Sequence, residues 1–291
     1  MDVKQEICSA PPEADSHLAA AEYTGVKGTG MKKLLVTDFD RTLYVDGSIS
    51  GRNREAIRQW REEGNLFAVA TGREEMVLRG LLQENDVETD YLICSNGANI
   101  VSWEGKKLFQ KTMDDDTAWQ LTEFLIKEYA ISVDVTLTEE RVQVNGMETE
   151  VETETEILYY GINRKCSLEE FRKLRGQVLQ VHIRFPERDS TRKAAEKTER
   201  LYAETAAFAN ETNLDIVAKG VDKAEAVSFL LNQIKEKCLP SVIGDSFNDV
   251  GMICRFRGYA MTAASEEVKK YAANSFDSVA DCIDCLRSFP D

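Results

Sequence analysis

A short apolar run that ends in two acidic residues constrains the fold of this chain more than any other stretch. Residues 34–37 read Leu-Leu-Val-Thr, and Asp38-Phe39-Asp40 follows directly. An apolar run of this length indicates a buried strand of a parallel sheet. Side chains alternate along a strand, so we expect Asp38 and Asp40 to project to the same side. Two such carboxylates repel each other unless one is protonated or a divalent cation lies between them, and hard oxygen ligands favour Mg²⁺.

A second apolar run, residues 66–70, ends in Thr71-Gly72-Arg73. A threonine hydroxyl and the free N–H groups at the start of a following helix suit a phosphate group. A capped helix start without any ligand is the common alternative for such a turn. Because open α/β sheets bind ligands beyond the carboxyl ends of their strands, we expect this turn to share a site with the acidic pair.

A third strand end supplies further acidic groups. After residues 241–243 the chain reads Gly244-Asp245, and Asn248 and Asp249 follow closely. The glycine permits close backbone approach, and Asp245 can reach a metal beyond the strand end. The Asn248 amide can donate a hydrogen bond to a phosphate or another ligand.

Two lysines flank a predicted turn. Lys219 precedes Gly220, whereas Lys223 follows Asp222, a residue suited to capping a helix. A lysine in the first turn of a helix opposes the helix dipole, and a bound anion would relieve that repulsion. A solvated surface charge is the alternative for either lysine.

In order and position, these segments resemble the motifs of the haloacid dehalogenase (HAD) superfamily. The first motif, Asp-x-Asp-x-Thr after a hydrophobic strand, matches residues 38–42, and the second, a Ser or Thr after a strand, matches Thr71. The third, the Lys of Gly-Val-x-Lys, selects Lys223 over Lys219. The fourth, Gly-Asp-x-x-Asn-Asp, matches residues 244–249.

Two further segments resemble the Cof-type branch of this superfamily. They are Ala-Thr-Gly-Arg at residues 70–73 and Asn-Gly-Ala at residues 96–98. One departure is Arg41, which stands where many members carry glycine. The resemblance implies an α/β fold with a Rossmann-like, doubly wound parallel sheet core and an inserted α+β cap domain of the C2 type.

The resemblance also implies a mechanism, that of a Mg²⁺-dependent phosphatase that forms an aspartyl-phosphate. Asp38 is the expected nucleophile, and Asp40 is the expected general acid and base. Mg²⁺ is expected to bind Asp38, the backbone carbonyl of Asp40, and Asp245. Asp249 is expected to support Lys223 or the metal ligands. The expected phosphate-binding groups are Phe39 through its N–H, Thr71, Gly72, Lys223 and Asn248.

The pattern of apolar and polar residues changes near residue 113. Alternating patterns over residues 131–137, 141–147 and 178–185 predict strands, and an Ala-rich amphipathic stretch over residues 191–210 predicts a long helix. Four polar residues of this insert are candidates for contacting the organic part of a substrate: Arg141, Arg164, His182 and Arg184. The expected division of the chain is a flexible leader over residues 1–30, a core from residues 31–112 and 211–291, and a cap over residues 113–210.

The net charge limits the kinds of partner that we expect, and the cysteines indicate the compartment. A net charge of −15 over 291 residues argues against nucleic acid, which needs basic surfaces. No apolar run is long enough to span a membrane, and seven scattered cysteines favour a reducing compartment. These features favour a cytoplasmic protein, and the resemblance implies an enzyme that hydrolyses small phosphorylated metabolites, with sugar phosphates as the leading class.

Two other interpretations stay open from the sequence. One is a phosphomutase on sugar phosphates, which would keep the phosphoryl group and turn its substrate around in the site. The other is a non-catalytic regulator that binds a phosphorylated ligand on the same fold. The intact residues Asp38, Asp40, Lys223 and Asp245 weigh against the regulator, and a phosphate-release assay separates it from a phosphatase.

Overall fold

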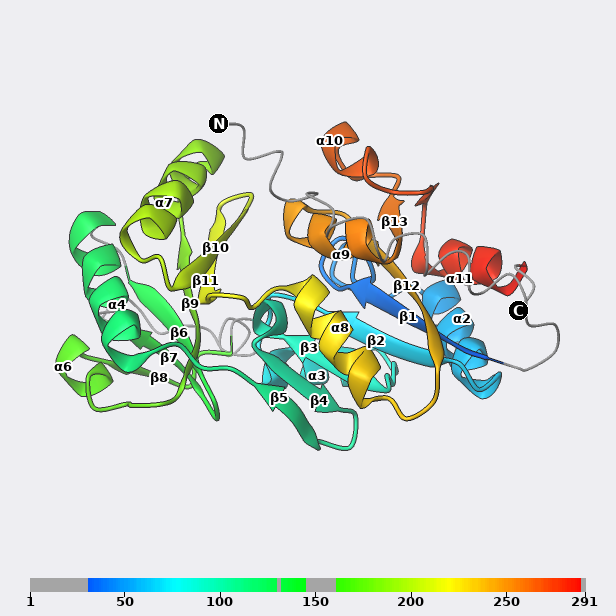
Figure 1. The fold of residues 1–291 in the computed structure, drawn as a ribbon, viewed down its shortest axis with the longest axis horizontal. Coiled ribbons are helices and arrows are strands. Elements are labelled where there is room, and N and C mark those ends of the chain that lie inside the picture. The colour runs from blue at the N-terminus through cyan, green and yellow to red at the C-terminus, as the bar shows by residue number, and fades with distance from the viewer. Residues whose placement is uncertain (1–30, 130–131, 145–160, 289–291) are drawn as a thin grey trace. The chain divides into compact units, whose positions relative to one another are not determined.

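The computed structural model describes residues 31–129, 132–144 and 161–288 (Figure 1). The chain forms two compact units, one from Met1–Phe67 with Ile234–Asp291 and the other from Ala68–Gln233. The predicted leader, residues 1–30, lies outside the described residues, as do residue 131 of one predicted strand and residues 145–147 of another.

The first unit contains four parallel strands in the order β14-β13-β12-β1. Their bounds are β1 Lys32–Asp38, β12 Cys238–Gly244, β13 Arg257–Met261 and β14 Ser275–Phe276. Strand β1 pairs with β12 so that Thr37 lies opposite Ile243. The residues that follow these two strands, among them Asp245, therefore leave the sheet at adjacent positions on the same edge.

The helices of the first unit are α2 Gly51–Glu62, α9 Val250–Arg255, α10 Glu266–Lys269 and α11 Val279–Ser288, with the short 3-10 helix η4 at Phe247–Asp249. Serine side chains cap the starts of α2, α10 and α11, whereas α9 begins without a side-chain cap. The Ser50 hydroxyl accepts from the Asn53 N–H at 3.2 Å and caps α2. The Asn53 side chain in turn accepts from the Ala280 N–H at 3.0 Å, which joins α2 to α11.

The second unit begins with strands that continue the α/β pattern. They are β2 Leu66–Ala70, of which Ala68 onward belongs to this unit, β3 Tyr91–Cys94, β4 Asn99–Ser102 and β5 Lys107–Gln110. Strand β3 runs parallel to β2, whereas β4 and β5 form an antiparallel extension. The accompanying helices are α3 Glu75–Glu84, α8 Lys223–Gln233 and the 3-10 helix η3 Ser95–Gly97.

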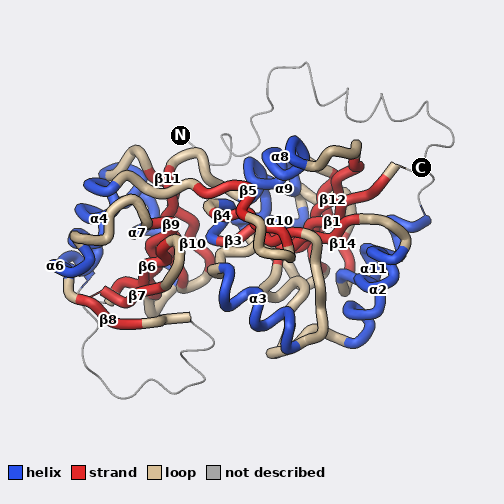
Figure 2. The backbone as a smooth tube through the Cα atoms, turned by 90° about the horizontal axis from the view of Figure 1, so that it is seen from below, coloured by secondary structure: helices blue, strands red, loops and turns tan. Residues whose placement is uncertain are grey.

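The rest of the second unit is a six-stranded sheet, which we call the insert sheet, with the order β10-β11-β9-β6-β7-β8. Its strands are β6 Val133–Leu137, β7 Arg141–Val144, β8 Arg164–Cys166, β9 Val178–Arg184, β10 Thr205–Asn210 and β11 Asn213–Ala218. Helices α4 Asp115–Tyr129, α6 Leu168–Phe171 and α7 Arg188–Leu201 lie along one side of it (Figures 1 and 2).

The two faces of the insert sheet differ in polarity because side chains alternate along each strand. One face packs against the helices and contributes Val133, Val135, Val181, Ile183, Leu214 and Ile216 to the core. The opposite face carries Asp134, Thr136, Gln143, Gln180, His182 and Asp215. The α/β fold with an added α+β part is confirmed in its class.

The predicted long helix over residues 191–210 is wrong in its second half. Helix α7 ends at Leu201, and Thr205–Asn210 forms β10, which pairs antiparallel with β11. Pairing with a strand across a tight turn outweighs the helix propensity of the alanines here. Strand β11 belongs to the insert sheet, so the predicted boundary at residue 210 falls inside this hairpin; the division into core and cap stays a prediction.

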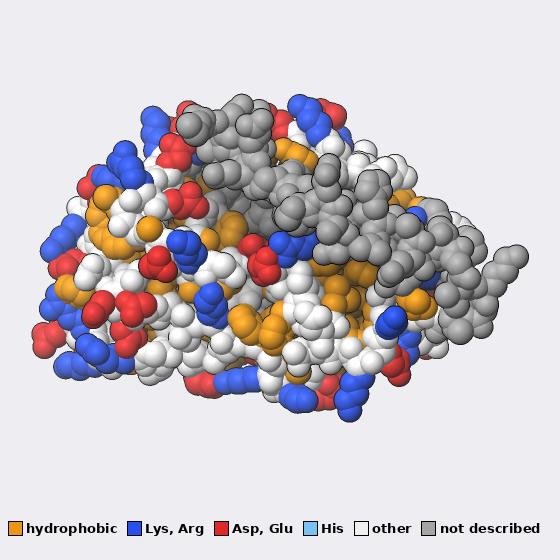
Figure 3. Space-filling view, in the orientation of Figure 1, with side chains coloured by type: hydrophobic (Ala, Val, Ile, Leu, Met, Phe, Trp, Pro, Cys, Tyr) orange, Lys and Arg blue, Asp and Glu red, His pale blue; other side chains and the backbone are white. Residues whose placement is uncertain are grey.

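Among residues 31–129, 132–144 and 161–288, no helix has both the length and the apolar character needed to cross a membrane. On the face drawn in Figure 3, blue basic and red acidic side chains are interspersed over the described surface.

Candidate active site

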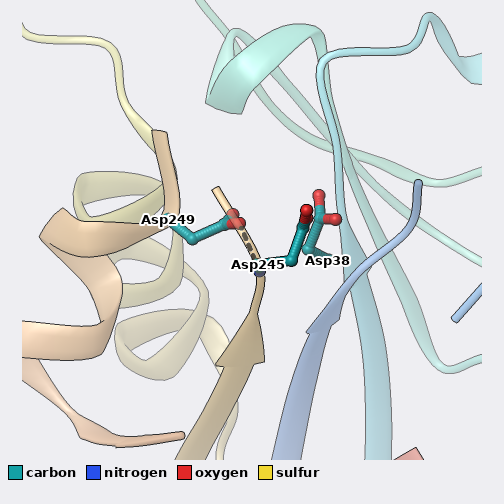
Figure 4. Close-up of side chains that lie close together, drawn as sticks. All are labelled: Asp38, Asp245 and Asp249. Atoms are coloured by element: carbon teal, nitrogen blue, oxygen red, sulfur yellow. Dashed lines mark hydrogen bonds between the residues drawn. The ribbon is translucent and has the colours of Figure 1, made fainter. Parts of the chain in front are cut away.

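Three carboxylates gather where the first unit's central strands end. Asp38 is the last residue of β1, Asp245 follows β12, and Asp249 ends η4. One oxygen from each lies within 4.8 Å of the others, and Asp38 and Asp249 are buried (Figure 4). Carboxylates this close repel one another, and oxygen ligands at such spacing suit a hard divalent cation. We call these residues the acidic cluster.

Asp249 has a definite structural task within the acidic cluster. One of its carboxylate oxygens accepts from the backbone N–H groups of Asp245 and Ser246, both at 3.0 Å. A Cβ atom at Gly244 would lie 2.5 Å from this carboxylate, so the close approach requires glycine. Asp249 therefore shapes the loop that presents Asp245, a contact that the sequence analysis did not anticipate.

Arg41 places a positive charge beside the acidic cluster. Its guanidinium lies 3.0 Å from Asp245 Oδ2 and donates to Ser246 Oγ at 2.9 Å. The Arg41 backbone has φ 62°, in the left-handed region where glycine is favoured. Glycine would adopt this conformation at no steric cost, whereas arginine adds the side-chain contacts to Asp245 and Ser246.

The other predicted residues of the first unit surround the end of β1. Phe39 is buried and stacks on Tyr44, with ring centroids 5.0 Å apart, and its carbonyl accepts from the Leu43 and Tyr44 N–H groups at 3.0 and 2.8 Å. Asp40 is half-buried in the resulting turn, and Asn248 is half-buried in η4. The acidic cluster joins Asp38 to Asp245 and Asp249, and Asp40 is not one of its members.

The Thr71-Gly72 turn lies in the second unit and is held at both ends. The Thr71 N–H donates to the Ile93 carbonyl at 2.8 Å, and the Thr71 hydroxyl accepts from the Arg73 N–H at 3.1 Å. Thr71 is buried, so its position is fixed by packing as well as by these bonds.

The Glu74 carboxylate accepts hydrogen bonds from N–H groups at the helix start that were predicted to bind a phosphate. It accepts from Val77 N at 2.9 Å and from Met76 N at 3.1 Å, and so caps α3. Burial raises the pKa of the Glu74 carboxyl, whereas these two N–H groups and the charge of Arg141 lower it. The expectation that the helix start is free for an anion is therefore wrong for these two amides, and phosphate binding by Thr71 and Gly72 stays a prediction.

The two lysines differ in their surroundings. Lys223 is the first residue of α8 and is 1% exposed, and Asp222 caps the helix by accepting from the Glu225 N–H at 2.7 Å. The Lys219 side chain is 61% exposed and lies 3.5 Å from Glu204. Burying an ammonium group is costly, so Lys223 has a position that surface solvation does not explain.

The four candidates in the insert have different surroundings. Arg141 is buried and pairs with Asp134 at 3.2 Å, whereas Arg164 pairs with Glu140 at 2.9 Å on the surface. Arg184 is exposed. His182 lies on the polar face of the insert sheet, with Nδ1 2.7 Å from Asp215 Oδ1.

Sequence reasoning missed the polar partners of the Thr71-Gly72 turn. Gln180 Nε2 donates to the Gly72 carbonyl at 3.0 Å and to Asp215 Oδ1 at 3.2 Å. The available signal was a polar residue at every second position of β9, at Gln180, His182 and Arg184, with apolar residues between them.

Comparison with known proteins agrees with this arrangement. Residues 35–283 match the family of haloacid dehalogenase-like hydrolases. The chain belongs to this family. It is 27% identical over 264 residues to the 5-amino-6-(5-phospho-D-ribitylamino)uracil phosphatase YcsE of Bacillus subtilis (strain 168), with 86% of this chain and 94% of that protein covered.

Solved structures of haloacid dehalogenase-like proteins share the fold. A haloacid dehalogenase-like hydrolase from Bacteroides thetaiotaomicron aligns with TM-score 0.73 and 26% identity over 88% of this chain and 99% of that one. The subclass IIB sugar phosphatase BT4131 aligns with TM-score 0.74 and 19% identity over 88% and 99%. The predicted superfamily and Cof-type branch are confirmed, and the protein is a phosphoric monoester hydrolase that acts on phosphorylated small molecules.

Proposed function

We propose that this haloacid dehalogenase-like hydrolase is a Mg²⁺-dependent phosphatase of sugar phosphates and related polyol phosphates, working through an aspartyl-phosphate. The observation that carries the proposal is the acidic cluster, in which a strand-end aspartate, Asp38, lies beside Asp245 at the next strand end. A carboxylate nucleophile beside a second carboxylate needs a cation to approach a phosphate dianion.

The proposed chemistry uses this chain's own residues in two steps. In the first, an Asp38 oxygen attacks phosphorus, the bond from phosphorus to the ester oxygen breaks, and Asp40 gives a proton to the departing alkoxide. In the second, Asp40 takes a proton from a water molecule as that water attacks phosphorus, which releases phosphate and restores the Asp38 carboxylate.

Asp38, the Asp40 carbonyl and Asp245 are the proposed ligands of Mg²⁺, which when bound offsets the negative charge of nucleophile and phosphate. The Phe39 N–H, Thr71, Gly72, Lys223 and Asn248 are proposed to hold the phosphoryl oxygens. Because charge stays on those oxygens through the transition state, fixed donors supply much of the catalysis. Asp249 supports the loop of Asp245 through the backbone contacts described above.

The proposed substrate class draws support from one relative. The curated name of YcsE describes a phosphate ester on a ribityl chain, a polyhydroxylated leaving group, and YcsE aligns with 86% of this chain. We propose residues 113–210, extended by the β11 strand, as the cap that contacts that leaving group, and the cytoplasm as the site of action.

The test is a phosphate-release screen over a panel of sugar, polyol and carboxylate phosphates, with MgCl₂ and with EDTA. We expect release from sugar and polyol phosphates with MgCl₂ and loss of release with EDTA, restored by added Mg²⁺. A phosphomutase would convert sugar phosphates to isomers when given a bisphosphate activator, and a regulator would bind phosphate esters without release.

Asp40→Asn is expected to slow the enzyme according to its leaving group. An amide cannot donate the proton that a sugar alkoxide needs, whereas p-nitrophenolate leaves without one. We expect kcat for a sugar phosphate to fall by about 10²-fold to 10⁴-fold, the usual range for general acid catalysis, and kcat for p-nitrophenyl phosphate to fall less. Equal losses on both esters would remove Asp40 from the acid role.

Arg41→Gly is expected to strengthen binding of Mg²⁺ about fivefold. The guanidinium is half-exposed and pairs with the largely buried Asp245 carboxylate; a pair screened by solvent on one side is worth on the order of 1 kcal/mol, which the cation must displace. Glycine also accepts the φ of 62° at no steric cost. Calorimetric titration with MgCl₂ measures the change, and Arg41→Ala controls for charge without the added backbone freedom. Weaker binding in both variants would mean that Arg41 helps to shape the site.

A further inference from the structure

Asp215 is the centre of a polar network on the insert sheet. Its Oδ1 lies 2.7 Å from His182 Nδ1 and accepts from Gln180 Nε2 at 3.2 Å, and its Oδ2 accepts from Asn96 Nδ2 at 3.0 Å. A carboxylate can accept at both oxygens, which an amide cannot. Three side chains from two segments, β9 and η3, therefore converge on one half-buried charge.

This network contacts the predicted phosphate-binding turn. Gln180 donates to the Gly72 carbonyl, and the Asn96 N–H donates to the Thr71 carbonyl at 2.9 Å. A Cβ atom at Gly72 would lie 2.7 Å from Asp215 Oδ2, so the carboxylate lies directly against the turn. The polar face of the insert sheet is therefore in direct contact with the predicted phosphate-binding turn.

His182 is oriented by Asp215 and not by the other carboxylate beside it. In the sheet register, Asp215 of β11 and Asp134 of β6 both lie opposite His182. Asp134 instead accepts from Arg141 and Gln143, each at 3.2 Å. When a neutral imidazole donates from Nδ1 to a carboxylate, its Nε2 is left with a lone pair that accepts a hydrogen bond.

We infer that His182 contacts the leaving group of the substrate through Nε2, accepting from a hydroxyl or amine, and that Asp215 is the positioning residue that fixes its tautomer. The inference rests on the proposed function, because it takes the Thr71-Gly72 turn to hold the phosphate. The leaving group is then a hydroxylated or aminated chain. One of its hydroxyl or N–H groups donates to His182 Nε2 while the phosphate is held at the Thr71-Gly72 turn.

The tautomer is tested by NMR, independently of activity. The chain has two histidines, so His17→Gln leaves His182 as the single imidazole. In this background, at a pH where the ring is neutral, we expect the ¹⁵N shifts to show the proton on Nδ1. Asp215→Asn should move the population toward the Nε2-protonated form, and Asp134→Asn, the matched control on the opposite strand, should leave it unchanged. Protonation mainly on Nε2 in the parent protein would overturn the inference.

The contact itself is tested with a pair of histidine variants. In His182→Asn the amide nitrogen takes the place of Nδ1 and keeps a donor for Asp215, but nothing replaces Nε2. We expect KM for D-ribitol 5-phosphate to rise about fivefold to tenfold, the worth of one neutral hydrogen bond, with kcat changed less. In His182→Gln the amide reaches the Nε2 position, and we expect KM to fall part of the way back to the wild-type value. Activity on p-nitrophenyl phosphate, which lacks the hydroxyls, should stay within about twofold in both.

The outcomes separate this inference from the proposed function. A wild-type protein that releases no phosphate from any ester with MgCl₂ would overturn the proposed function. A wild-type protein that hydrolyses p-nitrophenyl phosphate but no hydroxylated ester would overturn both the inference and the proposed substrate class. A His182→Asn protein that loses equally on both esters would overturn the inference alone and leave the proposed function intact.

Discussion

Asp38→Asn is expected to abolish turnover of every phosphate ester, with kcat reduced by at least about a thousandfold, because an amide cannot act as the nucleophile. The change is isosteric, and Asp38 sits at the end of a buried strand whose partners are backbone groups of β12, so the fold should survive. Initial rates with a sugar phosphate and with p-nitrophenyl phosphate measure the loss, and circular dichroism checks the fold.

A trapping experiment gives the same prediction a direct chemical readout. Acid quenching of the wild-type enzyme during turnover of a ³²P-labelled ester should leave label on the protein as an acyl phosphate, and Asp38→Asn should carry none. Turnover of a sugar phosphate by a folded Asp38→Asn protein at a near-normal rate would refute the covalent mechanism.

Lys223→Ala is expected to lower kcat/KM by at least about a hundredfold, the scale for removing one preorganised electrostatic group. Lys223 is buried at the first turn of α8, where its charge opposes the helix dipole unless an anion is present. Lys223→Met serves as a second variant, because it removes the charge while filling most of the volume.

Lys219→Ala is the matched control for this loss. Lys219 lies four residues earlier, and its ammonium is exposed to solvent near Glu204. An exposed ion pair contributes little, so the rate should change by less than about threefold. If Lys219→Ala proved the more damaging substitution, the assignment of the motif lysine would be wrong.

The strand ends could be predicted from the sequence because their chemistry is local. An apolar run that stops at Asp38 and another that stops before Asp245 indicate two parallel strands, and parallel strands end at one edge of a sheet. The choice of Lys223 over Lys219 needed the resemblance to the Gly-Val-x-Lys motif, because local chemistry left a solvated surface charge open for either lysine.

The parts that could not be predicted depend on pairing between distant segments. Residues 205–210 have a composition that favours a helix, and only the neighbouring strand β11 makes them a strand. Asp215 and Gln180 are 35 residues apart, so their shared contact with the Gly72 turn is invisible without the register of β9 and β11. The left-handed backbone conformation of Arg41 could not be predicted either, because residues other than glycine seldom adopt it.

The pairing of β1 with β12 also sets an order of assembly. Lys32 lies opposite Cys238, so the two strands that carry Asp38 and Asp245 join segments about two hundred residues apart. Closing so long a loop is entropically costly, and the cost falls once the intervening chain is compact. On a ribosome the first strand must wait for most of the protein to be made before its partner emerges. We therefore expect β1 amides to gain protection from hydrogen exchange later than β9 amides during refolding, so that the chemistry-bearing end of the sheet is among the last parts to form.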